Sequence, residues 1–185
     1  YGVFDDYVLF VGNLEPRKNL VSLLKAYDKL DHSLQKKYAL LLVGAKGWRD
    51  DEIHELILEM IEKGIKIIQP TDYVDDLDLP ALISGAKAFA YVSVYEGFGI
   101  PPTEAMACGV PVISSYNSSL PEAVGDAALR VDALNITSIT KALKKILTND
   151  KLSLCLIDRG YSHIERFITR EIAIKFLESI EKAAK

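Results

Sequence analysis

The sequence holds few residues that could cross-link the chain or bind a metal ion: two cysteines and three histidines in 185 residues. Cys108 and Cys155 lie far apart, and neither has a second cysteine nearby. This pattern excludes a disulfide scaffold and a structural zinc site, because both need a framework of closely spaced ligands or partners. We therefore expect no metal site, and two buried free thiols in a reducing compartment.

Long apolar runs are also missing. The strongest stretches, residues 38–43 and 86–94, are far shorter than the roughly 18–20 residues that a membrane helix needs. The chain begins with Tyr1 rather than methionine, and no charged segment followed by an apolar one comes next. The sequence predicts a piece of a longer cytoplasmic protein, with no transmembrane segment and no export signal. A peripheral contact at the inner face of the membrane is compatible with this pattern.

An excess of positive charge is absent too. Lys and Arg number 22 against 26 Asp and Glu, a net charge of −4, which argues against nucleic acid as the main partner. The charge is uneven, because residues 1–140 carry 12 basic against 20 acidic side chains, whereas residues 141–185 carry 10 against 6. The basic segment favours an anionic partner surface or, as is more common, the solvated faces of helices.

The apolar residues that are present alternate between two spacings, in a chain whose 49% hydrophobic and 26% charged content suits one globular domain. Short apolar runs typical of buried strands cover residues 7–11, 38–43, 65–68, 88–94 and 110–114. Helical spacing marks residues 19–30, 50–63, 77–84, 103–108, 136–147, 152–161 and 170–184. This order predicts an α/β fold: a Rossmann-like, doubly wound parallel sheet with extra C-terminal helices. Ligands of such sheets bind at the carboxyl ends of the strands.

The loop after the first predicted strand carries two adjacent cations. Residues 12–19 read Gly-Asn-Leu-Glu-Pro-Arg-Lys-Asn, and their single glycine matches neither a dinucleotide fingerprint nor a P-loop. Arg17 and Lys18 suit a diphosphate, because charge-assisted hydrogen bonds contribute about 1.5–3 kcal/mol each. The alternative is a surface cation pair, which the nearby helix N-terminus would disfavour.

The turn after the fourth predicted strand favours an anion site made of backbone. Glycines flank Phe98, and two prolines follow at the start of a predicted helix. We expect free N–H groups of the turn and of the helix N-terminus to face the same crevice as the two cations. Glu96 before the turn and Glu104 in the first helical turn frame this site and suit neutral hydroxyl groups. The alternatives are a surface carboxylate at Glu96 and a favourable helix-end charge at Glu104.

These two glutamates lie in the segment EGFGIPPTEAMACGVPVI, with seven residues between them. The segment resembles the signature of the retaining group 1 glycosyltransferases, glycosyltransferase family 4, which have the GT-B fold. GNLEPRKNLVSLLKAY and LLLVGAKG are also similar to this family, and the resemblance runs from about Val8 to the last helix. It implies that residues 1–185 form the C-terminal half of that fold, the nucleotide-sugar (donor) binding domain. The N-terminal acceptor domain is absent from this chain, and the last helix is expected to pack on it.

The resemblance also implies roles for single residues. Arg17 and Lys18 would neutralise the donor diphosphate, Glu96 would bond a hydroxyl of the donor sugar, and Glu104 would hold the ribose hydroxyls. The nucleobase would lie near residues 69–74. The further donor-binding positions that it implies are Gly12, Asn13, Gly97, Phe98, Gly99, Ile100, Pro101 and Thr103. The family usually has an arginine where this chain has Asn13, so Arg17 is expected to supply the missing charge.

The activity implied by the resemblance is a hexosyltransferase that needs no metal cofactor. It would move a sugar from a nucleoside-diphosphate donor, GDP-mannose before UDP-sugars, to a hydroxyl acceptor in bacterial polysaccharide or glycolipid assembly. The expected partners are the donor and the protein's own N-terminal domain, and the isolated fragment is expected to transfer nothing. Two alternatives stay open: a nucleotide-binding or regulatory module without transfer, and another GT-B enzyme such as an epimerase or a phosphorylase.

Other chemistry-bearing residues favour structural roles. The aspartates of residues 71–78 lack the spacing of a calcium loop and suit a helix start instead. His32, His54 and His163 are isolated and are expected to be structural or exposed. Trp48 either lines the cleft or, as we favour, covers the core, and Phe98 either touches the sugar or anchors its turn.

Overall fold

A computed structural model describes residues 1–167 and 169–183, and its framework is a single six-stranded sheet. All five strand pairs are parallel, in the order β3-β2-β1-β4-β5-β6. The strands are β1 (Asp6–Val11), β2 (Tyr38–Val43), β3 (Ile67–Ile68), β4 (Ala88–Tyr91), β5 (Val112–Ser115) and β6 (Ala128–Val131). Every residue of β2 and β4 is buried, as expected for parallel strands that are covered on both faces.

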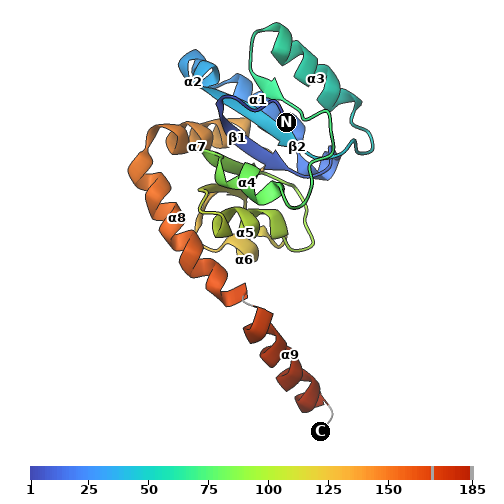
Figure 1. Cartoon of the computed structure of the whole chain (residues 1–185), viewed down its shortest axis with the longest axis vertical. Helices are drawn as coiled ribbons and strands as arrows, with labels where there is room; N and C mark the ends of the chain where they lie inside the picture. Colours follow the sequence, from blue (N-terminus) through green and yellow to red (C-terminus); the bar gives the residue numbers. More distant parts are fainter. Residues whose placement is uncertain (168, 184–185) are drawn as a thin grey trace.

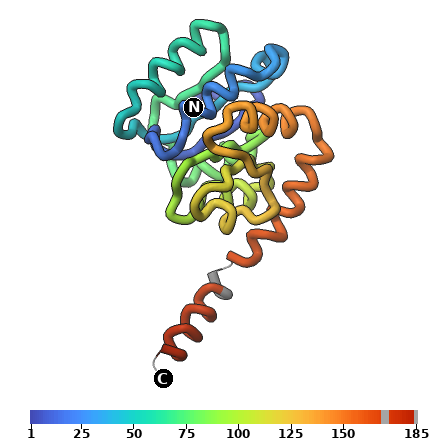
Figure 2. Tube along the Cα trace, turned by 180° about the vertical axis from the view of Figure 1, so that it is seen from behind, coloured from blue at the N-terminus to red at the C-terminus, as the bar shows by residue number. Residues whose placement is uncertain are grey.

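Helices form two groups around this sheet (Figures 1 and 2). In the first group, α1 (Leu20–Asp28) packs against α3 (Asp51–Glu62) and α7 (Ile136–Thr148). In the second, α5 (Ile100–Ala107) packs against α4 (Leu79–Ser84), α6 (Leu120–Val124) and α8 (Asp150–Ile164). The smaller or terminal elements are η1 (Pro16–Lys18), α2 (His32–Lys37), η2 (Glu165–Phe167) and α9 (Thr169–Ala183). The predicted Rossmann-like, doubly wound α/β fold is confirmed.

Three elements were not predicted from the sequence, because they are short or polar. In β6 only the first and last residues are buried, so it lacks the continuous apolar run of an inner strand. The helix α2 buries only Gln35, and α6 has five residues, too few to show a helical period. The prediction that α5 begins at residue 103 is wrong: the helix begins at Ile100, because Pro101 and Pro102 lie inside its first turn.

The cysteines and the aspartate segment also need correction. Cys155 is exposed on α8 rather than buried, whereas Cys108 is half-buried, and both are free thiols. The helix predicted from residue 77 begins at Leu79, and its N-cap residue Asp78 makes no side-chain capping bond. Asp75 instead accepts a hydrogen bond from the Leu77 backbone N–H at 2.8 Å, so the aspartates shape the turn before the helix.

The loops after β1 and β2 are held against each other by a close approach of two glycines. The Gly12 N–H donates to the Val43 carbonyl at 2.8 Å. A Cβ atom at Gly44, which has a φ of +156°, would lie 2.0 Å from the Gly12 carbonyl oxygen. Only glycine permits this contact, so the floor of the strand-end crevice depends on it.

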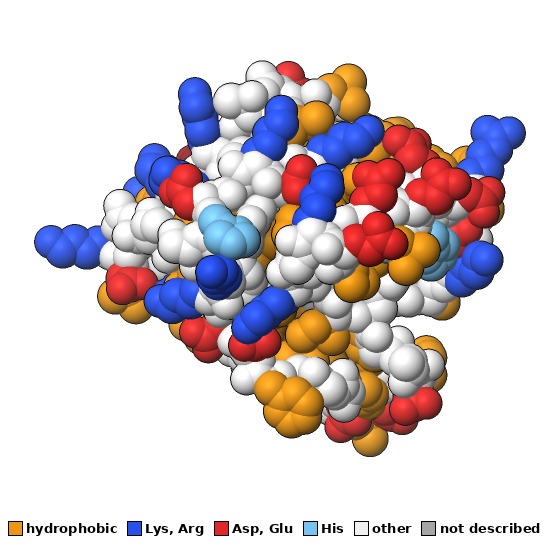
Figure 3. Space-filling model, turned by 90° about the horizontal axis from the view of Figure 1, so that it is seen from above, with side chains coloured by type: hydrophobic (Ala, Val, Ile, Leu, Met, Phe, Trp, Pro, Cys, Tyr) orange, Lys and Arg blue, Asp and Glu red, His pale blue; other side chains and the backbone are white. Residues whose placement is uncertain are grey.

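Charged side chains lie on the helix surfaces. Figure 3 shows basic and acidic side chains interspersed over the face seen from above, with acidic ones gathered on the side where α3 lies. Two ion pairs join the C-terminal segment to earlier parts of the chain: Asp150 pairs with Lys87 at 2.8 Å, and Lys144 pairs with Asp31 at 2.6 Å. For these four side chains, the solvated-face interpretation fits.

The helix α9 projects away from the rest of the domain in both views (Figures 1 and 2). Its apolar side chains are all at least 44% exposed: Ile172, Ile174, Phe176, Leu177 and Ile180. Its packing on an N-terminal domain stays a prediction. No helix in the described ranges is both long and apolar enough to span a membrane.

The N-cap of α8 gives a test of local stability. The Asn149 side-chain oxygen accepts a hydrogen bond from the Leu152 N–H at 3.0 Å. We expect Asn149→Ala to lower the free energy of unfolding by about 1 kcal/mol in urea titrations, because the N–H loses its partner. Asn149→Asp keeps the acceptor and should stay close to wild type. Equal losses in both variants would show that the cap is not responsible.

Candidate functional site

The loops after β1 and β4 meet at the carboxyl ends of these neighbouring strands, where the order of the sheet reverses. The Val94 N–H donates to the Arg17 carbonyl at 2.9 Å. Asn19, at a φ of 58°, donates from its side chain to the carbonyls of Val92 at 3.0 Å and Ala133 at 2.6 Å. These bonds fix the loop of residues 12–19 beside the end of β4.

A buried carboxylate binds both predicted cations. Lys18 Nζ donates to Glu96 Oε1 at 2.8 Å, and Arg17 Nη1 donates to Glu96 Oε2 at 2.8 Å. Lys18 and Glu96 are each only 7% exposed, whereas the Arg17 side chain is 41% exposed. Lys18 also donates to the Tyr91 hydroxyl, and Arg17 Nε pairs with Glu15 at 2.9 Å. The structure therefore brings the three predicted catalytic residues into one network, in which Arg17 is the accessible member.

The surroundings fix the protonation states of this network. Burial alone raises the pKa of Glu96, but the hydrogen bond and the charge of Lys18 help to lower it below its ordinary value of 4.5. Burial raises the pKa of Tyr91, and the negative charge of Glu96 raises it further. At neutral pH the site thus holds an ionised Glu96 and a neutral Tyr91 hydroxyl.

The lowered pKa of Glu96 makes stability depend on pH. Its contribution is complete above its ordinary pKa of 4.5 and is lost as the pH falls through the lower pKa of the folded state. We expect wild type to lose more thermal stability than Glu96→Gln on going from neutral pH to a pH below 4.5. Melting curves followed by circular dichroism measure this. Equal losses in the two proteins would contradict an ion-paired Glu96.

The glycine-rich turn offers free backbone donors beside this network. The N–H groups of Gly97, Phe98 and Gly99 donate to no backbone carbonyl in the described residues. Gly99 is the N-cap of α5 at a φ of 106°, and a Cβ there would lie 2.6 Å from the Leu120 side chain. Because Pro101 has no N–H, the donors at this helix end belong to the turn itself. The turn and the positive end of the helix suit an anion.

Two serines hold the turn in place. The Glu96 N–H donates to Ser118 Oγ at 2.9 Å. Ser119 Oγ lies 2.9 Å from the carbonyl oxygens of both Glu96 and Phe98, which share its single O–H donor. The turn is therefore fixed from the N-terminal end of α6.

A hollow of about 380 Å³ lies at the carboxyl ends of β2 and β3. It is lined by residues 43–46 and 70–74, which include most of the segment expected beside a nucleobase. Its volume falls within the usual range of small-molecule sites.

Comparisons with known proteins decide the family. The model of the family "Glycosyl transferases group 1" matches residues 4–163. The chain is 41% identical over 161 residues to O-antigen chain mannosyltransferase B of Escherichia coli, covering 87% of this chain and 42% of that protein. It is 35% identical over 153 residues to the serotype-specific mannosyltransferase WbdA of Escherichia coli, covering 81% of this chain and 18% of that protein.

The chain belongs to the group 1 glycosyltransferase family.

Solved structures share the fold. The C-terminal domain of a group 1 family protein, LpcC of Francisella tularensis, is 21% identical with a TM-score of 0.77, covering 86% of this chain and 84% of that one. Anabaena HepE, solved in complex with UDP and glucose, is 18% identical with a TM-score of 0.82, covering 96% and 48%. This chain thus spans less than half of the curated relatives that it matches, as its 42% share of the mannosyltransferase shows.

Other predicted positions of this group 1 domain lie around the network in different ways. A Cβ at Gly12 would lie 3.4 Å from Lys18 Cε, so Gly12 lies close to the Lys18 side chain, and Asn13 is exposed. The Thr103 hydroxyl donates back to the Ile100 carbonyl at 2.7 Å. Phe98 packs edge-on against Phe167, with ring centroids 5.5 Å apart, which favours its role as an anchor of the turn.

The placement of Glu104 differs from the prediction. The helix begins at Ile100, so Glu104 lies in its second turn rather than its first. Its side chain is exposed, forms no ion pair with a described residue, and lines a hollow with α4 residues such as Leu79. The structure does not bring it into contact with Glu96.

The histidines and Trp48 were expected to have structural roles, and the structure supports this for two histidines but not for Trp48. His54 pairs with Asp50 at 3.1 Å, and His163 lies 2.9 Å from the Ala123 carbonyl, in line with structural roles. Trp48 is 54% exposed beside Arg49, so the prediction that it covers the core is wrong. The described residues contain no cluster of His, Cys, Asp or Glu arranged to hold a metal ion.

The contributions of Tyr91, Asn19 and Ser119 were not predicted. Asn19 carries a weak signal, since asparagine is enriched at positive φ. Ser119 and Glu122 have the spacing of a capping box, which predicts a helix start at Ser119. That helix start is present, but the hydroxyl bonds the turn instead of capping α6. Nothing in the sequence distinguishes Tyr91 from an ordinary buried strand residue.

Proposed function

We propose that this chain is the donor-binding domain of a retaining glycosyltransferase. The enzyme moves mannose from GDP-mannose to a hydroxyl acceptor in the assembly of a bacterial polysaccharide or glycolipid. The observation that carries the proposal is the Arg17–Glu96–Lys18 network beside the free N–H groups of the glycine-rich turn. The names of the two Escherichia coli relatives support mannose as the sugar.

The network gives a physical account of donor binding. Lys18 is buried and holds one oxygen of Glu96, whereas Arg17 is partly exposed and can turn towards a diphosphate. A diphosphate that takes the Arg17 guanidinium frees Glu96 Oε2 to accept a hydrogen bond from a sugar hydroxyl. Glu96 can thus bond a sugar hydroxyl while the two cations bind the diphosphate.

The transfer step needs charge stabilisation at the leaving group. The bond between the anomeric carbon and the diphosphate oxygen breaks, and the nucleoside diphosphate leaves with the electron pair. The acceptor oxygen bonds to the same face of that carbon and passes its proton to the departing diphosphate oxygen. Lys18, Arg17 and the N–H groups of the turn stabilise the developing negative charge. We expect no metal ion to be needed.

The nucleobase is assigned to the hollow at the ends of β2 and β3, lined by residues 70–74. The acceptor binds an N-terminal domain, against which the exposed apolar face of α9 packs. Glu104 lies in the second turn of α5, and the ribose hydroxyls are assigned to its carboxylate. The cytoplasmic location, at the inner face of the membrane, stays a prediction.

Calorimetric titrations of this chain with GDP, UDP and ADP, in the presence of EDTA, test the proposal. We expect GDP to bind most tightly and Arg17→Ala/Lys18→Ala to weaken binding at least 30-fold. Lys25→Ala/Lys87→Ala removes two cations that pair with Glu52 and Asp150 outside the network, and is the matched control. Nucleotide binding that survives in the site variant, or a complete protein that binds none of the three nucleotides, would contradict the proposal.

A further inference from the structure

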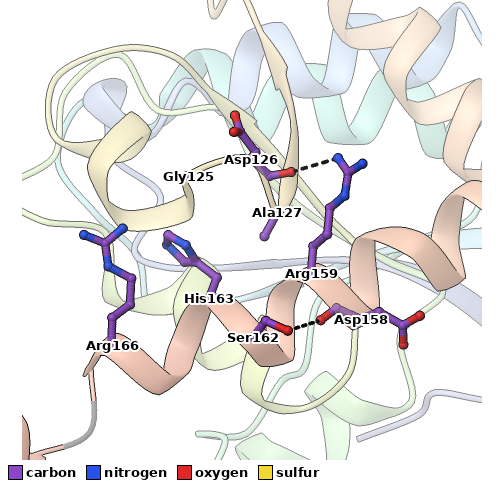
Figure 4. Close-up of a pocket in the computed structure, with 8 residues that line it drawn as sticks. All are labelled: Gly125, Asp126, Ala127, Asp158, Arg159, Ser162, His163 and Arg166. Atoms are coloured by element: carbon purple, nitrogen blue, oxygen red, sulfur yellow. Dashed lines mark hydrogen bonds between the residues drawn. The ribbon is translucent and has the colours of Figure 1, made fainter.

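A second hollow, of about 560 Å³, lies between the turn after α6 and one face of α8 and η2 (Figure 4). It is lined by residues 125–127 and by the side chains of Asp158, Arg159, Ser162, His163 and Arg166. None of these residues belongs to the donor network or to the glycine-rich turn. The hollow is therefore separate from the site proposed for the nucleotide sugar.

Three basic side chains share this hollow. Arg159, His163 and Arg166 lie three or four residues apart, so they lie along one face of the helical segment, and Figure 4 shows all three extending towards the turn. Neither arginine lies within ion-pair distance of a carboxylate among the side chains that the structure describes. Arg159 has only a long bond, 3.4 Å, to the Asp126 carbonyl. Two guanidinium groups are thus available at one hollow.

The acidic residues of the hollow do not neutralise the two arginines. The Asp126 carboxylate pairs with Arg130 at 2.9 Å. The carboxylates of Asp126 and Asp158 both point away from the three basic side chains in Figure 4.

The wall of the hollow is built for close contact. Gly125 has a φ of +52°, and a Cβ there would lie 2.5 Å from the His163 ring. His163 Nε2 lies 2.9 Å from the Ala123 carbonyl, which can only accept, so this nitrogen donates. The imidazole is thereby held against the turn between the two arginines.

We propose that this hollow binds a phosphate group. Guanidinium groups match phosphate oxygens with paired hydrogen bonds, and two of them here have no carboxylate partner in the described structure. The volume is that of a small-molecule site and exceeds what one phosphate fills. The ligand is therefore a phosphorylated molecule, either a soluble phosphate ester or the headgroup of an anionic phospholipid.

Site-resolved NMR with inorganic phosphate tests this proposal, because it separates this hollow from the donor crevice. We expect amide shifts at residues 125–127 and 159–166 on titration of the ¹⁵N-labelled chain. Arg159→Gln/Arg166→Gln should weaken the binding reported by these amides about tenfold or more. Lys145→Gln/Lys151→Gln removes the same charge from exposed positions outside the hollow and should leave it unchanged.

Vesicle flotation distinguishes the two sources of phosphate. Phosphatidylcholine vesicles with and without phosphatidic acid are compared, using the same two double variants and circular dichroism to confirm folding. Arginine-dependent shifts with free phosphate support a soluble ligand, and arginine-dependent binding to phosphatidic acid vesicles supports a headgroup. The proposal is overturned if neither probe binds, or if both bind as well to the folded Arg159→Gln/Arg166→Gln protein.

Discussion

Lys18→Ala in the complete enzyme is expected to lower the turnover of sugar transfer about 30- to 1000-fold. Lys18 is the buried cation of the network, with Nζ 2.8 Å from Glu96 and a further bond to Tyr91. A positive charge fixed in this way stabilises the leaving diphosphate without reorganisation, and its removal costs about 2–4 kcal/mol in the transition state. Initial rates with GDP-mannose measure the effect.

Folding must be separated from chemistry in this experiment. Glu96 keeps its bond to Arg17 when Lys18 is removed, so the variant should fold, as circular dichroism will show. Lys87→Ala, which breaks an exposed ion pair with Asp150, is the control and should retain its rate. A folded Lys18→Ala enzyme with turnover within a few-fold of wild type would show that Lys18 is not catalytic.

Gly44→Ala is expected to have the largest effect on stability, about 3 kcal/mol less free energy of unfolding. The added Cβ would lie 2.0 Å from the Gly12 carbonyl, which is backbone and cannot move as a side chain does. The loops after β1 and β2 would have to separate, and a Cβ at Gly12 would lie only 3.4 Å from Lys18 Cε, so this movement reaches the surroundings of Lys18. Urea unfolding measures the loss.

The matched control for this substitution is Gly64→Ala. Gly64 has a φ of +81° but no atom within 4 Å of the added Cβ, so it reports backbone strain without a clash. Its loss should be clearly smaller than that of Gly44→Ala. Equal losses at the two positions would show that the close approach between the strand-end loops contributes nothing.

The position of the site followed from the sequence because parallel strands place their carboxyl ends at one edge. The apolar runs before Gly12 and before Glu96 predicted two strands, and the adjacency of β1 and β4 brought Arg17, Lys18 and Glu96 together. The sequence of a loop carries less information about which side chains its residues bind. That both cations bind Glu96 depends on tertiary contacts that no local spacing encodes.

The failures have a similar physical origin. Glu104 was assigned to the first turn because the helical spacing marked residues 103–108, whereas the helix already begins at Ile100 and includes both prolines. Trp48 was expected over the core but is 54% exposed, because the local sequence around Gly47 carries no information on which way the side chain faces after folding. The arginine hollow was missed because Arg159 and Arg166 meet residues 125–127 only after the chain folds.

The claim that the crevice at the ends of β1 and β4 binds a nucleoside diphosphate is tested most directly by an NMR titration of the ¹⁵N-labelled chain with GDP in EDTA. We expect the largest amide shifts at residues 12–19, 70–74 and 96–100, and their loss in Arg17→Ala/Lys18→Ala. Shifts confined to residues outside these segments, or unchanged in the double variant, would contradict it.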